Sequence, residues 1–251
     1  MKMYHPIGNK RIYFIKSCEK IIKFLLLLFL SFFLKINRNK NEIIISSAFN
    51  APWKEDKEFS SFHEKIKDLT LLDSKRLYTL WYLARSLRNT KGNIFEIGCL
   101  QGGAGFIMSR ANNTGYTYLF DTFEGFQEEE KFHKKKHFVY EKKEIVQKNI
   151  KKFKLKNTKV YKSKFPNKLD LSIKKKKLKL CHIDVNTYKS TKKTFEFVSK
   201  RMIKGGIIVF DDYGIYGADS IKKFVNKISK KNTKDFSFIF NFMGQCILIK
   251  K

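Results

Sequence analysis

The chain has 251 residues, of which 43% are hydrophobic and only 3 are proline, and it carries a formal net charge of +30. This length and composition exclude a disordered chain and allow one substantial hydrophobic core in an α/β domain. Only seven of the 53 basic residues are arginine. Because arginine is the preferred residue for phosphate and base recognition, the charge favours a compositional bias toward lysine, or an anionic membrane surface, over nucleic acid.

The first predicted element is a helix around an unbroken apolar run, FLLLLFLSFFL at 24–34, with Lys23 and Lys35 at its ends. Eleven helical residues span roughly 17 Å, which is shorter than the roughly 30 Å hydrocarbon core of a bilayer. No small-residue cleavage site of a signal peptide follows Leu34. Three placements stay open: a helix at the membrane interface, a short span, or a helix packed on the domain or on a partner. We expect residues 1–45 to lie outside the catalytic fold.

The next segment, 46–72, shows no firm hydrophobic period, and we expect a mobile entry or lid segment there. The catalytic domain, 73–251, begins with a helix whose free N–H groups either Asp73 or Ser74 can cap. The buried face of this helix is predicted from apolar residues at helical spacing, which are Leu77, Leu80, Trp81, Ala84 and Leu87.

From there the chain alternates short apolar runs with helical stretches. We predict seven strands, at 94–97, 116–120, 160–161, 180–183, 207–210, 236–240 and 246–249. The helices between them are predicted at 103–112, 140–153, 190–203 and 218–229. Repeated strand–helix units are typical of a doubly wound, mostly parallel sheet, here closed by a hairpin. Such sheets bind ligands at the carboxyl ends of their strands.

The first strand runs into a glycine-rich turn, Glu96-Ile-Gly98-Cys-Leu-Gln-Gly102-Gly103. Glycine lets the backbone approach a ligand at a helix N-terminus, although many such turns only make a tight connection. The spacing differs from the G-x-G-x-x-G of dinucleotide-binding proteins, and the Lys-Ser/Thr ending of a phosphate loop is missing. The turn therefore points to a nucleotide-like ligand other than NAD or ATP.

Asp121 ends the second predicted strand, where doubly wound folds commonly place an acid that accepts hydrogen bonds from ribose hydroxyls. The alternative is that Asp121 caps the turn that follows. Carboxylates at neighbouring strand ends, from Glu96 and Asp121, suit a neutral or cationic adenosyl ligand and not a pyrophosphate. We therefore expect an adenosyl group at this edge of the sheet.

Three more aspartates are predicted at adjacent strand ends: Asp184 after the fourth strand, and Asp211 with Asp212 after the fifth. Three carboxylates this close repel one another strongly unless a cation joins them, and hard oxygen ligands favour Mg²⁺ or a similar ion. The structural alternative is that they cap helices or face solvent. We prefer a metal site.

Four blocks, FEIGCLQGGAG, LFDTFEGF, HIDVNTYKST and GGIIVFDDYG, resemble the macrocin O-methyltransferase family in order and spacing, from about Leu71 to Lys251. The resemblance implies the Rossmann-like fold of class I methyltransferases, with S-adenosyl-L-methionine and Mg²⁺ as cofactors and a sugar hydroxyl as acceptor. By this resemblance, Asp184, Asp211 and Asp212 would bind Mg²⁺, and the metal would orient two neighbouring hydroxyls. The implied cofactor-binding residues are Glu96, Gly98, Gly102, Gly103, Asp121, Thr122, Phe123 and Ser163.

The chain departs from the family at one catalytic position. The family pattern D-x-D-x-Y-x-S-T has a second aspartate that resembles a general base, whereas this chain has Asp184-Val-Asn186. The Asn186 amide cannot accept a proton at neutral pH, although its carbonyl can orient a hydroxyl or bind a metal. Three explanations stay open: metal activation suffices, another base such as His182 or His63 substitutes, or catalysis is weak. His182 lies two residues before Asp184 and so shares its face of the strand, where a buried histidine is more often a core residue.

Two further positions receive a weaker interpretation. His133 and His137, spaced as HKKKH, could share a helical face and bind a metal, but among so many lysines we expect them to be solvated. Ser163 stands where the family tends to carry glycine, which leaves its contact with adenine open.

The main hypothesis is a metal-assisted sugar O-methyltransferase whose acceptor is a sugar or glycan, with a lipid-linked or envelope glycan favoured by the apolar N-terminal segment. One alternative is an RNA methyltransferase or nucleic-acid-binding protein, supported by charge alone. Another is a non-catalytic relative that keeps the cofactor site, suggested by Asn186. Four cysteines without C-x-x-C spacing indicate a reducing, cytoplasmic setting, with the N-terminal segment at the inner face of a membrane. A homo-oligomer is left open.

Overall fold

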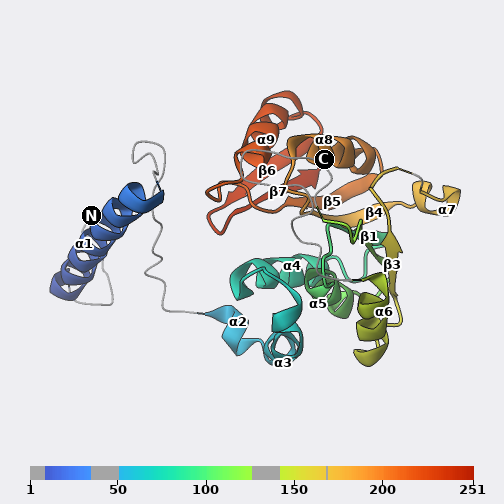
Figure 1. Cartoon of the computed structure of the whole chain (residues 1–251), viewed down its shortest axis with the longest axis horizontal. Coiled ribbons are helices and arrows are strands. Elements are labelled where there is room, and N and C mark those ends of the chain that lie inside the picture. The colour runs from blue at the N-terminus through green and yellow to red at the C-terminus, as the bar shows by residue number, and fades with distance from the viewer. Residues whose placement is uncertain (1–8, 35–50, 126–141, 168) are drawn as a thin grey trace. The chain divides into compact units, whose positions relative to one another are not determined.

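The computed structural model describes residues 9–34, 51–125, 142–167 and 169–251 (Figure 1). The chain divides into two compact units, Met1–Ala51 and Pro52–Lys251. We describe each unit by itself.

The first unit contains helix α1 (Asn9–Leu34), which includes the predicted apolar run. Many of its large apolar side chains are exposed, namely Phe14, Ile21, Ile22, Phe24, Leu25, Leu26, Leu28, Phe29, Phe32 and Phe33. Within the described ranges, no helix combines the length and the hydropathy needed to cross a membrane. α1 is therefore a helix with an unusually large uncovered apolar surface.

The second unit is built on a seven-stranded sheet in the order β3-β2-β1-β4-β5-β7-β6. The strands are β1 (Asn93–Ile97), β2 (Thr117–Asp121), β3 (Thr158–Lys162), β4 (Leu178–Ile183), β5 (Met202–Phe210), β6 (Phe236–Asn241) and β7 (Gln245–Lys250). The first five are parallel, and β7 runs antiparallel to both β5 and β6. The predicted doubly wound sheet with a closing hairpin is thus confirmed. Chain order reverses between β1 and β4, the position where such sheets open a ligand crevice.

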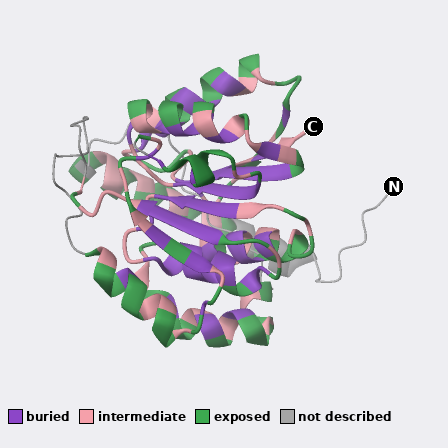
Figure 2. Cartoon of the chain, turned by 90° about the vertical axis from the view of Figure 1, so that its right-hand side faces the viewer, coloured by how far each residue is buried: buried purple, intermediate pink, exposed green. Residues whose placement is uncertain are grey.

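Helices cover both faces of this sheet, so that the buried strands lie between two helical layers (Figure 2). The helices are α2 (Pro52–Glu55), α3 (Lys57–Ile66), α4 (Ser74–Ser86), α5 (Gly103–Ala111), α6 (Lys143–Lys152), α7 (Leu171–Lys174), α8 (Tyr188–Ser199) and α9 (Asp219–Lys231), with a 3₁₀ turn at Lys67–Leu69. Successive strand residues face opposite layers. Ile94 belongs to the core cluster that includes buried residues of α3, α4 and α5, and Phe95 belongs to the cluster that includes buried residues of α7, α8 and α9.

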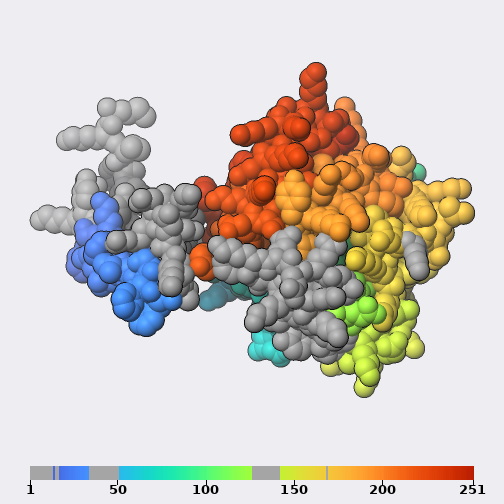
Figure 3. Space-filling view, turned by 45° about the horizontal axis from the view of Figure 1, so that its top comes forward, coloured from blue at the N-terminus to red at the C-terminus, as the bar shows by residue number. Residues whose placement is uncertain are grey.

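The two edges of the sheet are far apart on the surface. In the space-filling view, the red residues of α9 and the closing hairpin and the yellow-green residues of α6 and β3 lie toward opposite ends of the catalytic unit (Figure 3). The crevice between β1 and β4 lies in the middle of the sheet order.

The structure gives helices to the segment at 46–72, whose role as a mobile entry or lid segment stays a prediction. Residues 46–50 lie outside the described part, but α3 and its neighbours give the rest regular structure. The Asp56 side chain caps α3 by accepting a hydrogen bond from the Phe59 N–H at 3.0 Å. Phe59, Phe62 and Ile66 are buried at helical spacing. The helix has only about three turns, and charged residues interrupt its apolar ones, so its period was not recognised.

Helix boundaries differ at two other places. The helix predicted at 190–203 ends at Ser199, because β5 already begins at Met202. It starts earlier than predicted because Thr187 caps it, with the side-chain oxygen 3.4 Å from the Ser190 N–H. The helix predicted at 140–153 is described from Lys143, and residues 140–141 lie outside the described part.

Candidate active site

A pocket opens at the carboxyl ends of β1, β2 and β4, where chain order reverses. The strand ends and the turns that follow them supply most of its lining: Glu96, Ile97, Gly98, Cys99, Leu100, Ala104, Phe120, Asp121, Thr122, Gly125, Ser163, Lys164, Phe165, Asp184, Val185, Asn186, Thr187 and Ser190. A second segment, Thr70–Leu72, closes the pocket from just before α4. Five of the eight predicted cofactor-binding residues line this pocket, whereas Gly102, Gly103 and Phe123 lie beside it.

The glycines of the turn allow close backbone packing. Gly98 has a φ of +89°, and a Cβ there would lie 1.8 Å from the carbonyl oxygen of Asp184. At Gly103 a Cβ would lie 2.6 Å from the carbonyl oxygen of Leu69. The turn is therefore pressed between the end of β4 and the segment before α4, and any larger residue would separate them.

Asp121 holds the turn from the end of β2. One carboxylate oxygen accepts the Leu100 N–H at 2.8 Å, and the other accepts the Phe123 N–H at 2.8 Å. Both donors belong to non-glycine residues with positive φ, +46° at Leu100 and +53° at Phe123. Asp121 thus fixes two strained turns, which was the alternative interpretation. Each carboxylate oxygen has a second lone pair that these two contacts leave unused. Because Asp121 also lines the pocket, a lone pair that points into it would accept a hydrogen bond from a ligand hydroxyl.

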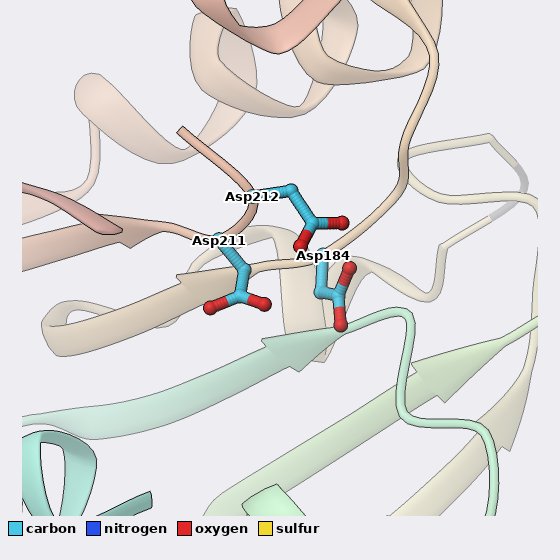
Figure 4. A group of neighbouring side chains, drawn as sticks. All are labelled: Asp184, Asp211 and Asp212. Atoms are coloured by element: carbon cyan, nitrogen blue, oxygen red, sulfur yellow. The ribbon is translucent and has the colours of Figure 1, made fainter. Parts of the chain in front are cut away.

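The three predicted metal ligands converge at the ends of β4 and β5 (Figure 4). One carboxylate oxygen from each of Asp184, Asp211 and Asp212 lies within 4.8 Å of the other two. Burial and the charges of Asp211 and Asp212 raise the pKa of Asp184 well above its usual value. Burial and Asp211 likewise raise the pKa of Asp212. The cluster therefore strongly disfavours three negative charges at once, a condition that a bound cation relieves.

The chemistry of the cluster fits a divalent cation. Its donors are hard carboxylate oxygens, and Asp184 borders both the cluster and the pocket. A buried acceptor beside Asp211, Gln245 Oε1, has no hydrogen-bond partner in the described part of the chain. Unsatisfied buried polar atoms are uncommon and often mark a place for an ion or water. Asp184, Asp211 and Asp212 could hold Mg²⁺ or a similar ion.

His182 is buried in β4 between two acids. Its Nδ1 lies 3.1 Å from both carboxylate oxygens of Glu96, and its Nε2 lies 3.6 Å from Asp211 Oδ1. Burial alone would lower the pKa of His182, but these two carboxylates raise it well above its usual value. A histidine that already carries a proton cannot act as a general base, and His182 does not line the pocket. The geometry favours a charged bridge between β1 and β5.

Of the remaining predicted positions, two line the pocket, one lies outside it, and two lie outside the described residues. Asn186 lines the pocket with a φ of +56°. Ser163 also lines it, and the Ser163 N–H donates to the Asp121 carbonyl at 2.8 Å. His63 lies on α3 with its ring 5.4 Å from Phe59, outside the pocket lining. His133 and His137 lie outside the described residues.

The model of one family, macrocin-O-methyltransferase (TylF), matches residues 31–237 of the 251-residue chain. The chain belongs to this family. It is an S-adenosylmethionine-dependent O-methyltransferase, and the predicted family and activity are confirmed. The match begins 40 residues before the resemblance noted at Leu71 and so includes part of the N-terminal segment.

Solved structures support the fold of this macrocin-O-methyltransferase family member. The O-methyltransferase NovP is 18% identical, with a TM-score of 0.62 over 73% of this chain and 82% of its own. CalS11, a calicheamicin methyltransferase, is 13% identical, with a TM-score of 0.54 over 82% and 99%. An O-methyltransferase from Bacillus cereus is 15% identical, with a TM-score of 0.51 over 89% and 96%. Comparison with curated protein sequences gives no match.

Two residues at the aspartate cluster were missed by the sequence analysis. Arg76 of α4 contacts Asp211 and Asp212, and Gln245 of β7 donates from Nε2 to Asp211 Oδ1 at 3.0 Å. Arg76 lies three residues after the N-cap Asp73, so the sequence suggested only a local pair at a helix start. Gln245 follows a hairpin turn with no motif around it. Only the tertiary fold brings the two to the cluster.

Proposed function

We propose that this O-methyltransferase acts on a sugar hydroxyl and that Asp184, Asp211 and Asp212 hold a divalent cation during the reaction. The observation that carries the proposal is the convergence of these three carboxylates beside the pocket at the ends of β1 and β4. The acceptor class is the one that the resemblance to the macrocin-O-methyltransferase family implies.

Two neighbouring groups of residues would bind the two reactants: the pocket lining would bind the cofactor, and the aspartate cluster would bind the acceptor. Gly98, Asp121 and Ser163 line the pocket that would take S-adenosylmethionine, which supplies a methyl group on a sulfonium leaving group. Asp184 borders that pocket and the aspartate cluster, so an acceptor held at the cluster would lie next to the methyl donor. Placing the two reactants in line at near-attack distance supplies much of the rate of such a displacement.

Activation of the hydroxyl is the second requirement. A divalent cation at the cluster would make a coordinated hydroxyl more acidic. Asn186 lines the pocket where the family pattern has an aspartate, and its amide would orient the hydroxyl without removing its proton. Activation by a cation would therefore carry more of the catalysis in this chain than in relatives with two acids.

The test is methyl transfer by the full-length protein from labelled S-adenosylmethionine to glycan extracts and, separately, to RNA. We expect label in O-methyl sugars, lost on addition of EDTA. Asp184→Asn should abolish transfer while cofactor binding persists, and the exposed Asp170→Asn should behave as wild type. Transfer that withstands EDTA would rule out the cation, and label found only in RNA would rule out the sugar acceptor.

We also propose that α1 attaches the enzyme to an anionic membrane surface, where lipid-linked glycans would be its acceptors. The support is the set of exposed apolar side chains of α1 together with five basic residues and one acid in the same helix. An apolar helix with cationic residues at one end gains both burial in the lipid and attraction to anionic headgroups. The apolar run is too short to span, so insertion into one leaflet is the expected mode.

Flotation with lipid vesicles tests this attachment. Full-length protein should float with vesicles containing anionic lipid and much less with zwitterionic vesicles. A Phe29→Lys, Phe32→Lys double variant should lose flotation. Phe242→Lys, which changes a phenylalanine of the catalytic unit that is as exposed as Phe32, is the control and should float normally. Unchanged flotation of the double variant would refute the attachment through α1.

A further inference from the structure

Arg76 of α4 contacts the aspartate cluster. Its Nη1 lies 2.5 Å from Asp211 Oδ2 and 3.1 Å from Asp212 Oδ1. Its Nε lies 3.0 Å from Asp73 Oδ2, on the residue that caps α4. The Arg76 side chain is only 14% exposed, and that of Asp211 only 1%. One partly buried guanidinium therefore joins three carboxylates.

These contacts occupy oxygens that a cation would need. Asp211 has Arg76 on Oδ2 and Gln245 on Oδ1 at 3.0 Å, so both of its oxygens already accept hydrogen bonds. Asp212 shares Oδ1 with the same guanidinium nitrogen. Asp184 has no recorded ion pair among the described residues. A cation entering the cluster finds Asp184 and the second oxygen of Asp212 available, whereas it must share Asp211 with Arg76 and Gln245.

We infer that Arg76 is a built-in counter-ion of the cluster, which stabilises Asp211 and Asp212 before a divalent cation binds and weakens the binding of that cation. This inference rests on the proposed cation site. Three carboxylates within 4.8 Å repel one another strongly, and the His182 ring, 3.6 Å from Asp211 Oδ1, is shared with Glu96. A guanidinium is always charged and so supplies a permanent positive charge.

The Arg76 charge lowers the affinity of the cluster for a cation. A guanidinium that contacts the same oxygens lies within a few ångströms of the incoming ion, and like charges at that distance repel even in a well-solvated site. Removing the charge should therefore tighten cation binding by about tenfold or more. It should also destabilise the cation-free protein, because the carboxylates lose their partner.

Arg76 also connects the cluster to the cofactor pocket. Its third contact, Asp73, directly follows the pocket-lining segment Thr70–Leu72. The guanidinium thus ties the start of α4 to the end of β5. A cation that draws Asp211 and Asp212 away from Arg76 would loosen this tie, so Arg76 is a positioning residue for both places.

The experiment measures Mn²⁺ binding by titration calorimetry and thermal unfolding in EDTA, for full-length wild type and three variants. Arg76→Gln removes the charge and Arg76→Lys keeps it. Arg85→Gln is the matched control, since Arg85 lies on the same helix and pairs with Asp56 at 3.2 Å, away from the cluster. We expect Arg76→Gln to unfold at a lower temperature in EDTA and to bind Mn²⁺ about tenfold more tightly. Arg76→Lys and Arg85→Gln should bind Mn²⁺ close to the wild-type affinity.

The outcomes distinguish the counter-ion role of Arg76 from the proposed cation site on which it rests. Equal or weaker Mn²⁺ binding by Arg76→Gln, with measurable binding by wild type, would overturn the counter-ion role and leave the cation site standing. No Mn²⁺ binding by any of the folded proteins would overturn both. If Arg76→Gln does not fold in EDTA, millimolar Mn²⁺ during refolding should restore its circular dichroism spectrum, and failure to restore it would count against the inference.

Discussion

Asp121 shows how one side chain can serve both architecture and ligand binding. Its two oxygens hold the N–H groups of Leu100 and Phe123, which have positive φ values of +46° and +53°. Backbone strain of this kind costs energy and persists only where neighbouring contacts enforce it. The first testable prediction follows from this double contact.

Asp121→Ala should destabilise the fold by about 2 kcal/mol or more, because two hydrogen bonds to a carboxylate are lost and two strained turns are released. The affinity for S-adenosylmethionine should fall at least about tenfold, since the turn that lines the pocket loses its fixed shape. Urea unfolding and calorimetric titration with the cofactor measure the two effects. Glu124→Ala, an exposed change in the same loop, is the control. Wild-type affinity in a destabilised Asp121→Ala protein would show that Asp121 is structural only.

Asn186 has a backbone conformation that explains part of its identity. Its φ of +56° is left-handed, and asparagine tolerates this region better than most residues. Asn186→Ala should therefore lose about 1 kcal/mol of unfolding free energy, whereas Asn186→Gly should lose less or none. Chemical denaturation of both variants measures the difference. Equal stabilities would mean that the left-handed conformation is not enforced at this position.

At the residue scale, the sequence predicted that the acids of the candidate site lie at adjacent strand ends, but it missed the positive charge that contacts Asp211 and Asp212. Asp121 ends β2, Asp184 follows β4, and Asp211 with Asp212 follows β5. The carboxyl ends of parallel strands meet at one edge of a sheet. Arg76 lies on a helix that begins far from these residues in the chain, 135 positions from Asp211. A contact across that separation depends on the packing of α4, which no local pattern encodes.

Among the elements, β4 is held at its start by the buried polar contacts of one lysine. At its start, the Lys179 ammonium is fully buried and donates to the carbonyl oxygens of Leu87, Thr90 and Thr114, each at 3.0 Å. These carbonyls belong to the loops after α4 and before β2. A lysine inside a strand thus connects two loops to the central strand, without any acidic partner in those bonds.

Lys179→Met should cost about 1–3 kcal/mol at neutral pH, since the buried carbonyls lose their donor. Burial lowers the pKa of Lys179 to about 8, from 10.5 in the unfolded chain. Between these values the unfolded chain keeps a proton that the folded chain has lost, so this group makes stability rise with pH across that window. The stability difference between wild type and Lys179→Met should therefore grow from pH 8 upward. The exposed Lys177→Met is the control, and a difference that shrinks with pH would contradict the argument.

The strands and most helices could be predicted because their apolar residues follow a clear period. α3 could not, since only Phe59, Phe62 and Ile66 are buried in it and charged residues stand between them. Its end cap, Asp56, also accepts from Trp81 Nε1 at 3.0 Å, a contact that depends on the position of α4. The end of α8 was misplaced for a different reason. Met202 continues the apolar spacing of the helix but begins β5.

For the molecule as a whole, the net charge of +30 is the feature least connected to the active site. Among the described residues, the aspartate cluster includes no lysine and the pocket lining includes one, Lys164. The charge therefore bears on where the enzyme binds and not on what it catalyses. The proposed membrane attachment assigns that role to the N-terminal unit.

The division of the chain into two units gives the last prediction. The catalytic unit, Pro52–Lys251, contains the whole sheet, both core clusters and every described residue of the site. Removal of residues 1–40 should therefore leave the unfolding midpoint and the affinity for S-adenosylmethionine at the full-length values. Calorimetry of both proteins in the absence of lipid measures the two quantities. In flotation with anionic vesicles, the full-length protein should float and the truncated protein should not. A truncated protein that no longer binds the cofactor would show that the N-terminal unit contributes to the site, and one that still floats would transfer the membrane contact to the catalytic unit.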